Sequence, residues 1–374
     1  MIIAFCLYKY FPFGGLQRDF IRIAKTVAAR GHSVRVYTQS WQGECPAEFE
    51  LIVVPVHART NHGRNAEYYA WVQAHLHKHP VERIVGFNKM PGLDVYYAAD
   101  VCYAEKVARE KGYLYRLTPR YKHFSAFERC VFEPGAKTQL LMLTENQITD
   151  FQRHYKTESG RFHLLPPGIY PDRKYDHQIP NARAIYRQKN GIDDKQLLVL
   201  QVGSDFKRKG VDRSIEAVSA LPEKIRSRTQ LMVVGQDKPD RYIALARKHG
   251  IAGQVSFFAG RNDIAELMAS ADLLIHPARQ EAAGIVLLEA IVAGLPVIVT
   301  EICGYAPYIV AAQCGRVIAS PFQQSKLNEI LGQALMQDTR RGEWAAAARH
   351  YADTEDLYSL PEKAADLIIG EPNA

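Results

Sequence analysis

The chain has 374 residues, of which 47% are hydrophobic and 23% are charged, and its formal net charge is +7. These values are typical of a soluble globular protein with enough apolar material for two cores, and the modest charge leads us to expect no nucleic-acid partner. Because no run of about 18 uninterrupted apolar residues occurs and the first residues lack a basic region and a cleavage site, we expect a cytoplasmic protein.

The first predicted elements are a strand at 2–7 and a helix that ends near residue 30. Gly14 and Gly15 stand at the end of the loop between them, where a bare backbone and the helix dipole favour a phosphate or a sugar. A Rossmann dinucleotide site would show G-x-G-x-x-G, which is absent. The alternative for this segment is a plain strand-to-helix turn.

The rest of the first half continues the alternation of strands and helices. Strands are predicted near 33–37, 51–55, 83–87, 137–143 and 162–165, and helices near 65–79 and 146–154. Such alternation is typical of an α/β domain with a parallel sheet. The loop at 88–94 follows a strand and therefore lies on the expected ligand-binding side.

The segment 103–132 is basic and aromatic. It holds seven Lys or Arg against three Glu, an excess of four in a chain whose net charge is +7. Seven aromatic residues stand among these cations: Tyr103, Tyr113, Tyr115, Tyr121, Phe124, Phe127 and Phe132. Cations draw a segment toward anionic lipid head groups and aromatic rings settle at the interface, so we predict contact with an anionic membrane surface. The alternative is a solvated helix pair packed on its own domain.

A linker is predicted at 166–173, where three prolines and a glycine fall within eight residues. We therefore predict an N-terminal domain at 1–166 and a C-terminal domain at 167–356, each of them Rossmann-like and doubly wound. Their strand-to-helix loops would face each other across a cleft.

The second domain opens with a strand at 197–202 and a loop at 203–212 that leads into a helix. Arg208 and Lys209 stand in this loop, beside the helix start, and offer positive charge to a pyrophosphate. Strands near 231–234 and 255–258 follow, the second of them succeeded by Arg261. Helices are expected near 323–336 and 341–351. The alternative for Arg208 and Lys209 is a solvated helix start.

The stretch 271–300 reads as strand, loop, helix and strand. The loop holds His276, Arg279, Gln280 and Glu281. The helix begins at about Gly284, contains Glu289 and is ended by Gly294 and Pro296. Because the two glutamates occupy different elements, we do not expect them to share a proton. Ala283, Gly284 and Ile285 leave the backbone N–H groups at the helix start open to a phosphate. The alternative is an ordinary βαβ unit with a Glu on an exposed helix face.

This arrangement resembles the E-x7-E motif of the retaining glycosyltransferases of GT-B fold. The resemblance implies that Glu281 approaches the donor sugar, that Glu289 holds the ribose hydroxyls and that the amides between them meet the pyrophosphate. It also implies that the last stretch, 357–374, forms a helix that crosses back to the N-terminal domain. One departure concerns Ser204, because many members have an Arg directly after the glycine at this loop.

Five further stretches make the chain similar to the glucosyltransferases that build the lipopolysaccharide core. They are YFPFGGLQRD at 10–19, NHGRNAEYY at 61–69, GFNKMPGLD at 86–94, PGIYPDR at 167–173 and QEAAGIV at 280–286. The resemblance implies transfer of glucose from UDP-glucose, with retention, to the second heptose of the lipid-linked inner core. It also implies a peripheral location on the cytoplasmic face of the inner membrane, which would give 103–132 its purpose.

The resemblance also implies a set of site residues. Glu281 would contact the transferred sugar, Arg208 and Lys209 the phosphates, and Asp19 would lie near the reacting centre. The remaining members of the predicted donor site are Gly15, Arg173, Arg261, Ala283, Gly284, Ile285, Val286 and Glu289.

No Asp-x-Asp metal motif occurs in a suitable loop, and the six cysteines show no C-x-x-C spacing. We therefore expect no cofactor and no catalytic metal, with Arg208 and Lys209 stabilising the departing nucleoside diphosphate instead. We assign no nucleophile.

Other functions remain open at this point. A nicotinamide dehydrogenase would share the α/β architecture but needs the glycine fingerprint that is missing. A sugar-nucleotide epimerase of GT-B fold, or a glycosyltransferase of this fold with another nucleotide-sugar donor, would fit the same residues. A non-catalytic sugar-binding module is the third class, and the cationic loop argues against it because a neutral sugar gains little from Arg208 and Lys209.

Overall fold

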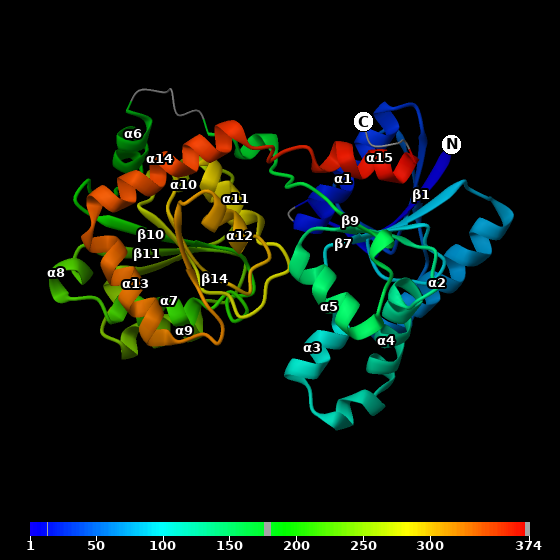
Figure 1. The fold of residues 1–374 in the computed structure, drawn as a ribbon, viewed down its shortest axis with the longest axis horizontal. Helices are drawn as coiled ribbons and strands as arrows, with labels where there is room; N and C mark the ends of the chain where they lie inside the picture. Colours follow the sequence, from blue (N-terminus) through cyan, green and yellow to red (C-terminus); the bar gives the residue numbers. More distant parts are fainter. Residues whose placement is uncertain (13, 176–180, 371–374) are drawn as a thin grey trace. The chain divides into compact units, whose positions relative to one another are not determined.

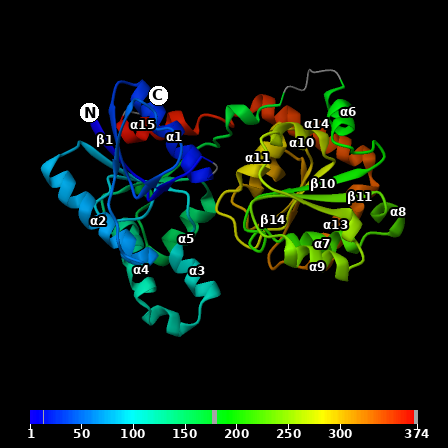
Figure 2. The same ribbon diagram turned by 180° about the vertical axis from the view of Figure 1, so that it is seen from behind.

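A computed structural model describes residues 1–12, 14–175 and 181–370 of the chain. The chain divides into two compact units. The first comprises Met1–Gly168 together with the stretch that starts at Ser359, and the second comprises Ile169–Tyr358. Both are parallel sheets flanked by helices (Figures 1 and 2). The unit boundaries fall two residues after those expected from the proline-rich linker and the final stretch.

The first unit is built on a seven-stranded sheet in which every paired strand is parallel. Its order is β5 (Phe49–Val53), β3 (Ser33–Thr38), β1 (Ile2–Cys6), β6 (Arg83–Gly86), β7 (Val95–Ala98), β8 (Gln139–Met142) and β9 (Phe162–Leu164). The central strands are apolar and buried on both faces, as expected for a parallel sheet covered by helices. A short pair, β2 (Lys9–Tyr10) and β4 (Ser40–Trp41), lies outside this sheet.

Six α-helices accompany this sheet: α1 (Gly15–Ala29), α2 (Asn61–Lys78), α3 (Tyr103–Glu110), α4 (Pro119–Phe132), α5 (Glu145–Tyr155) and α15 (Leu360–Ile369). The C-terminal helix α15 lies beside α1 in both views (Figures 1 and 2). Arg30, just after α1, donates to Asp366 of α15 at 2.6 Å. Gly168 approaches Leu360 so closely that an added Cβ would stand 2.6 Å from the leucine Cβ. The end of the chain is thus part of the first unit.

Helices α3 and α4 are tied to the first unit by a buried carboxylate. Glu128 of α4 is fully buried and accepts from Lys89 Nζ at 2.5 Å and Tyr155 Oη at 2.7 Å. It also accepts from the backbone N–H groups of Tyr103 and Ala104, at 2.7 and 2.9 Å, and so satisfies the start of α3. Burial raises the pKa of Glu128, but the charge and hydrogen bond of Lys89 outweigh it and lower the pKa. Glu128 therefore fixes the buried side of the segment 103–132 to the rest of the first unit.

The second unit contains a six-stranded sheet, again with parallel pairing throughout. Its order is β12 (Val255–Phe258), β11 (Thr229–Val234), β10 (Leu197–Val202), β13 (Leu273–His276), β14 (Val297–Thr300) and β15 (Gly315–Ile318). The strand β13 lies in the centre between β10 and β14, so the loop that follows it opens beside the switch in strand order, where α/β sheets bind ligands.

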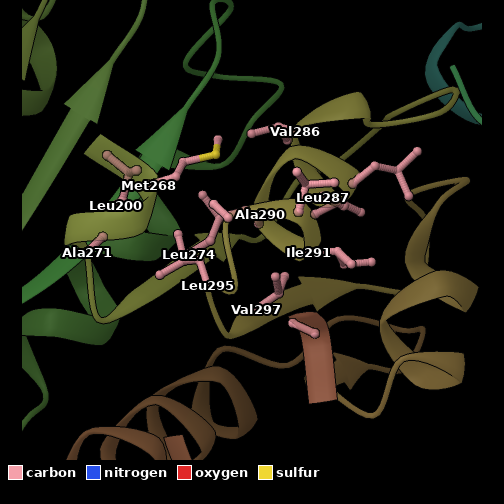
Figure 3. Packing of buried hydrophobic residues seen from close by; sticks show 14 of the residues in the cluster. Leu200, Met268, Ala271, Leu274, Val286, Leu287, Ala290, Ile291, Leu295 and Val297 are labelled. Atoms are coloured by element: carbon pink, nitrogen blue, oxygen red, sulfur yellow. The ribbon is translucent and has the colours of Figure 1, made fainter. Parts of the chain in front are cut away.

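Helices cover both faces of this sheet and pack apolar side chains against it. One face packs against α10 (Ile264–Ser270), α11 (Ile285–Val292), α12 (Ala306–Ala311) and α14 (Asp338–Thr354), and the other against α7 (Val211–Ser219), α9 (Asp240–Lys248) and α13 (Gln324–Met336). The remaining α-helices of the unit are α6 (Ala182–Lys189) and α8 (Glu223–Arg226). Figure 3 shows Leu287, Ala290 and Ile291 of α11 packed among Leu274 and Val297 of the strands. Because seven of the eight residues of α11 are buried, this helix and its start are firmly placed.

Four strands of the described residues are not predicted by the sequence, and one residue near the site changes its element. These strands are β2 and β4, which have two residues each, and β7 and β15, which have four residues each, as the predicted strands β12 and β14 do. His276, expected in the loop after the strand, is the last residue of β13 and pairs with Val299. None of the helices in the described ranges is long and apolar enough to span a bilayer.

Candidate active site

The candidate site of the second unit is centred on Glu281, which follows β13 by five residues. The residue forms a parallel bridge with Cys303, and the N–H of Tyr305 donates to the carbonyl of Ala283 at 2.8 Å. The loop is therefore fastened to the segment after β14, and the Glu281 side chain is only 12% exposed. Such a buried carboxylate needs partners.

Two cationic donors and an imidazole ring surround one oxygen of the Glu281 carboxylate. Lys209 Nζ forms a short ion pair with Oε2, Arg208 donates through one terminal nitrogen at 3.2 Å, and His276 Nε2 lies at 3.5 Å from the same atom. Burial raises the pKa of Glu281, but the charge of Lys209, the His276 ring and Arg208 outweigh it, so the pKa falls well below its usual value. Glu281 is an anion at every physiological pH.

Lys209 reaches Glu281 along a path that requires glycine on the preceding loop. Gly203 has φ +138°, and an added Cβ would stand 3.0 Å from Lys209 Cε. Gly210 has φ +71°, and a Cβ there would stand 2.2 Å from the carbonyl oxygen of Pro277. Both positions combine a left-handed backbone with a close approach, so side chains are excluded there. The Lys209 side chain itself is 11% exposed.

The loops at 203–210 and 277–281 are joined by hydrogen bonds. The N–H of Arg279 donates to the carbonyl of Arg208 at 2.7 Å, and its guanidinium forms two bonds to Asp212, at 2.8 and 2.7 Å. Arg208 in turn donates to the carbonyl of Gln280 at 3.1 Å. The cations and the carboxylate are thus held in a fixed mutual geometry, which favours electrostatic preorganisation.

The start of α11 lies directly beside Glu281. Gly284 is its N-cap with φ +95°, and an added Cβ would stand 3.3 Å from Glu281 Cγ. Ala283, Ile285 and Val286 carry no polar side chain, so this helix start presents backbone N–H groups next to Arg208 and Lys209. Partial positive charge from the helix adds to that of the two side chains.

Glu289 has a different partner from Glu281. It is the fifth residue of α11, is 7% exposed, and its Oε1 lies 3.3 Å from Arg173 Nε. Arg173 closes a short 3-10 helix, Pro171–Arg173, at the beginning of the second unit. Glu281 thus pairs with Lys209 and Arg208, and Glu289 pairs with Arg173, in agreement with the expectation that the two glutamates do not share a proton.

Arg261 belongs to a neighbouring cluster. It donates to Asp263 at 2.8 and 2.6 Å, to Tyr186 Oη at 3.1 Å and to Asn190 at 3.3 Å. The hydrogen bond from Arg261 lowers the pKa of Asp263 to about 2. Among the described residues no ion pair links Arg261 with Glu281, so its predicted role at the donor is not part of this cluster.

Gly15 and Asp19 belong to the first unit. Gly15 is the first residue of α1, after Gly14 in an extended conformation, and Asp19 lies one turn further on. The Asp19 carboxylate accepts a hydrogen bond from Tyr97 Oη at 2.8 Å, which ties it to β7. Both residues therefore stand at the beginning of the first helix after β1, as predicted.

His276 is the member of the cluster whose role the sequence does not reveal. Its position three residues after the apolar start of β13 was the only signal available. The group of residues as a whole can bind an anion through Arg208, Lys209 and the α11 start, and can accept a hydrogen bond from a polar ligand through Glu281. Within the described ranges no group of three or more His, Cys, Asp and Glu side chains is placed to hold a metal ion.

Two parallel-sheet units and an E-x7-E site with a cationic loop define a glycosyltransferase of GT-B fold. Residues 182–351 match the family model described as glycosyl transferases group 1. Over 370 residues the chain is 72% identical to the lipopolysaccharide glucosyltransferase WaaG of Escherichia coli strain K12, covering 99% of both chains.

The solved structures agree. The crystal structure of WaaG matches with a TM-score of 0.94 at 71% identity, covering 98% of this chain and 100% of the other. A sucrose-phosphate synthase from Thermosynechococcus elongatus matches with a TM-score of 0.78 at 17% identity over 99% and 97% of the chains, which shows the shared fold. The chain thus belongs to the lipopolysaccharide glucosyltransferase family.

Proposed function

We propose that the protein transfers glucose from UDP-glucose, with retention, to the second heptose of the lipopolysaccharide inner core. The observation that carries this proposal is the convergence of Lys209 and Arg208 on the buried Glu281, beside the start of α11. A nucleoside diphosphate needs such fixed positive charge as it departs, and the sugar needs a carboxylate that accepts its hydroxyl hydrogens. The 72% identity to a lipopolysaccharide glucosyltransferase supports the same reading.

In this mechanism each part of the cluster has one task. Arg208, Lys209 and the amides of 283–286 bind the diphosphate, Glu281 accepts from the glucose hydroxyls, and Glu289 accepts from the ribose hydroxyls. The bond between the anomeric carbon and the phosphate oxygen breaks, a heptose oxygen bonds to the same carbon, and the proton of the heptose hydroxyl passes to the departing diphosphate. Because Glu281 and Glu289 are both engaged by cations, we assign neither as a nucleophile. The donor-site roles of Gly15 and Asp19 stay predictions from the sequence.

Stabilisation of the leaving group by side chains in place of a divalent metal is part of this proposal. Lys209 and Arg208 stabilise the negative charge that grows on the β-phosphate oxygen. The loop at 203–210 holds Lys209 in place. Each such donor is expected to contribute on the order of a hundredfold to a thousandfold in turnover.

We further propose that the segment 103–132 binds the anionic cytoplasmic face of the inner membrane, where a lipid-linked acceptor is met. Six of its seven cations are exposed, and among the described residues none of the seven forms an ion pair. The turn between α3 and α4 exposes Tyr113, Leu114 and Leu117, by 77%, 76% and 62%. Glu128 is buried against Lys89 and Glu105 pairs with Arg153 and His154, so two of the three acidic groups do not offset this positive face.

Mass spectrometry of a heptose-terminated core oligosaccharide tests the proposed reaction. The acceptor is incubated with the protein and a panel of nucleotide sugars. We expect a single hexose to be added from UDP-glucose alone. Addition from another donor would correct the donor, and release of free nucleotide without sugar transfer would indicate an epimerase of the same fold.

A further inference from the structure

The residue behind the Glu281 carboxylate is His276, the last residue of the central strand β13. Its side chain is fully buried, and its backbone is fixed because β13 pairs with β10 on one side and with β14 on the other. Neither ring nitrogen has a hydrogen-bond partner among the described residues, but Nε2 lies only 3.5 Å from Glu281 Oε2 and so has an acceptor within reach. A buried imidazole is expected to form hydrogen bonds through its ring nitrogens wherever a partner is within reach.

Glu281 uses its two oxygens differently. Lys209, Arg208 and His276 all approach Oε2, and none of the contacts found for Glu281 in the described part of the chain involves Oε1. Oε1 is therefore the oxygen left to accept from a ligand, and Oε2 is the one by which the carboxylate is held.

The three neighbours of Oε2 differ in what a diphosphate would do to them. Lys209 and Arg208 carry positive charge and are the groups assigned to the donor phosphates, so a bound diphosphate competes with Glu281 for them. Burial lowers the pKa of His276, and the nearby Lys209 charge lowers it further, against the opposing effect of Glu281. A neutral imidazole is not drawn toward a phosphate, and it remains with the carboxylate.

We propose that His276 is a positioning residue which, as the Nε2–H tautomer, holds Glu281 Oε2 when the donor diphosphate draws Lys209 and Arg208 away. This inference rests on the proposed function, because it assigns the two cations to the phosphates and Oε1 to the sugar. The ring orients the carboxylate from behind and touches neither substrate. Loss of the imidazole should therefore lower the rate of glucose transfer and leave the affinity for the nucleotide unchanged.

Three variants test this role. His276→Leu keeps apolar bulk but removes the donor, and His276→Gln places an amide N–H close to the position of Nε2. Ile275→Val is the control, because Ile275 is buried in the opposite core of the same strand and its shortening weakens packing without touching the site.

The measurements are kcat for transfer from UDP-glucose and the Kd of UDP by titration calorimetry. We expect His276→Leu to lower kcat by about tenfold to a hundredfold, the range for groups that orient a ligand from behind. His276→Gln should recover to within about threefold of wild type, and UDP affinity should stay within about twofold in both. Ile275→Val should keep wild-type values of both quantities.

Several results would overturn the role of His276. They are unchanged kcat in His276→Leu, an equal loss in His276→Gln, or a loss of UDP affinity parallel to that of kcat. If His276→Leu does not fold, ¹⁵N-histidine spectra of wild-type protein with UDP decide the question, since the proposal requires a neutral Nε2–H ring, and an imidazolium or Nδ1–H ring would contradict it. A wild-type protein that binds UDP but transfers no glucose would instead refute the proposed function and leave the tautomer measurement standing.

Discussion

Lys209 and Glu281 form a buried ion pair across 72 positions of the sequence, with side chains that are 11% and 12% exposed. Both come from loops that follow central strands of one parallel sheet, which is why such distant residues meet. Burial makes the pair costly to break, because either partner alone would be an uncompensated charge. In the proposed mechanism a donor diphosphate offers Lys209 a second anion, so the proposal predicts that nucleotide binding and release of Glu281 are coupled.

Replacement of Glu281 by Gln should separate nucleotide binding from transfer. The amide keeps the shape but no longer competes for Lys209 and Arg208, so UDP should bind at least as tightly as to wild type. Turnover should fall by about a hundredfold or more, because the sugar loses a charged acceptor. Calorimetry with UDP measures the predicted affinity, and initial rates with UDP-glucose measure the predicted turnover. Glu266→Gln, on the exposed side of α10, is the matched control and should match wild type in both. Near-normal turnover in Glu281→Gln would remove Glu281 from the mechanism.

The same pair predicts the pH dependence of stability. Because the pKa of Glu281 is lowered on folding, its ionised form stabilises the protein fully above its usual pKa of 4.5, and this contribution declines as the pH falls toward the lowered value. The difference in unfolding free energy between wild type and Glu281→Gln should therefore be constant from pH 7.5 to about 5 and shrink below about 4.5. Urea titrations at a series of pH values measure it. A difference that grows on acidification would contradict the assignment.

Arg208→Ala and Lys209→Ala should each lower kcat by about a hundredfold to a thousandfold, because each removes a donor from the departing diphosphate. Lys207→Ala is the matched control, since Lys207 is exposed on the same loop. Its rate should stay close to that of wild type. Equal losses in all three variants would show that the general charge of the loop matters and not the two placed cations.

Loss of Glu128 should destabilise the first unit without a direct effect on the donor site. Glu128→Gln leaves Lys89 with a buried, uncompensated charge, which is expected to cost about 3–5 kcal/mol. Urea unfolding followed by circular dichroism measures this. The double variant with Lys89→Met should recover part of the loss, and Glu110→Gln on the exposed surface of α3 should cost little. Equal stability of Glu128→Gln and wild type would refute the anchoring role of Glu128.

Neutralising Lys111, Arg116, Arg120 and Lys122 together should weaken binding to vesicles that contain anionic lipid. Each cation near such a surface contributes about 1 kcal/mol, so the variant with all four substitutions should lose most of its affinity for anionic vesicles. Co-sedimentation with vesicles of phosphatidylglycerol and phosphatidylcholine measures the loss. Neutralising the exposed Lys224, Arg247 and Lys248 of the second unit is the control and should leave vesicle binding unchanged. If both sets weaken binding equally, membrane attraction is a property of net charge and not of 103–132.

The βαβ unit around Glu281 could be predicted from the sequence because the residues that mark its strands and helix are close together in the chain. Apolar runs, Gly284 and the Gly294 and Pro296 exit mark where α11 begins and ends. The two-residue strands β2 and β4 are too short for a pattern, and β15 begins with Gly315 and Arg316, which interrupt an apolar run. His276 was placed in the loop because strand ends depend on pairing with a distant strand, here at Val299, which the local sequence does not encode.

The side-chain partners were beyond the reach of sequence patterns. Arg208, Lys209 and Glu281 were all predicted as site residues, but their convergence on the single oxygen Oε2 depends on the fold and on rotamers. The donor role of Arg261 stays a prediction, and its hydrogen bonds to Asp263, Tyr186 and Asn190 could not be read from the sequence. Which acceptors a guanidinium contacts depends on the positions of side chains that the fold brings together.

The measurement that bears most directly on the proposed mechanism is glucose transfer by protein stripped of divalent metal. The protein is treated with a chelator and assayed with UDP-glucose and a heptose-terminated acceptor in metal-free buffer, with and without added magnesium or manganese. If Lys209 and Arg208 stabilise the leaving diphosphate, the stripped protein keeps its full rate and added metal changes it little, while Lys209→Ala remains slow in both conditions. A stripped protein that is inactive until magnesium or manganese is restored would contradict this mechanism.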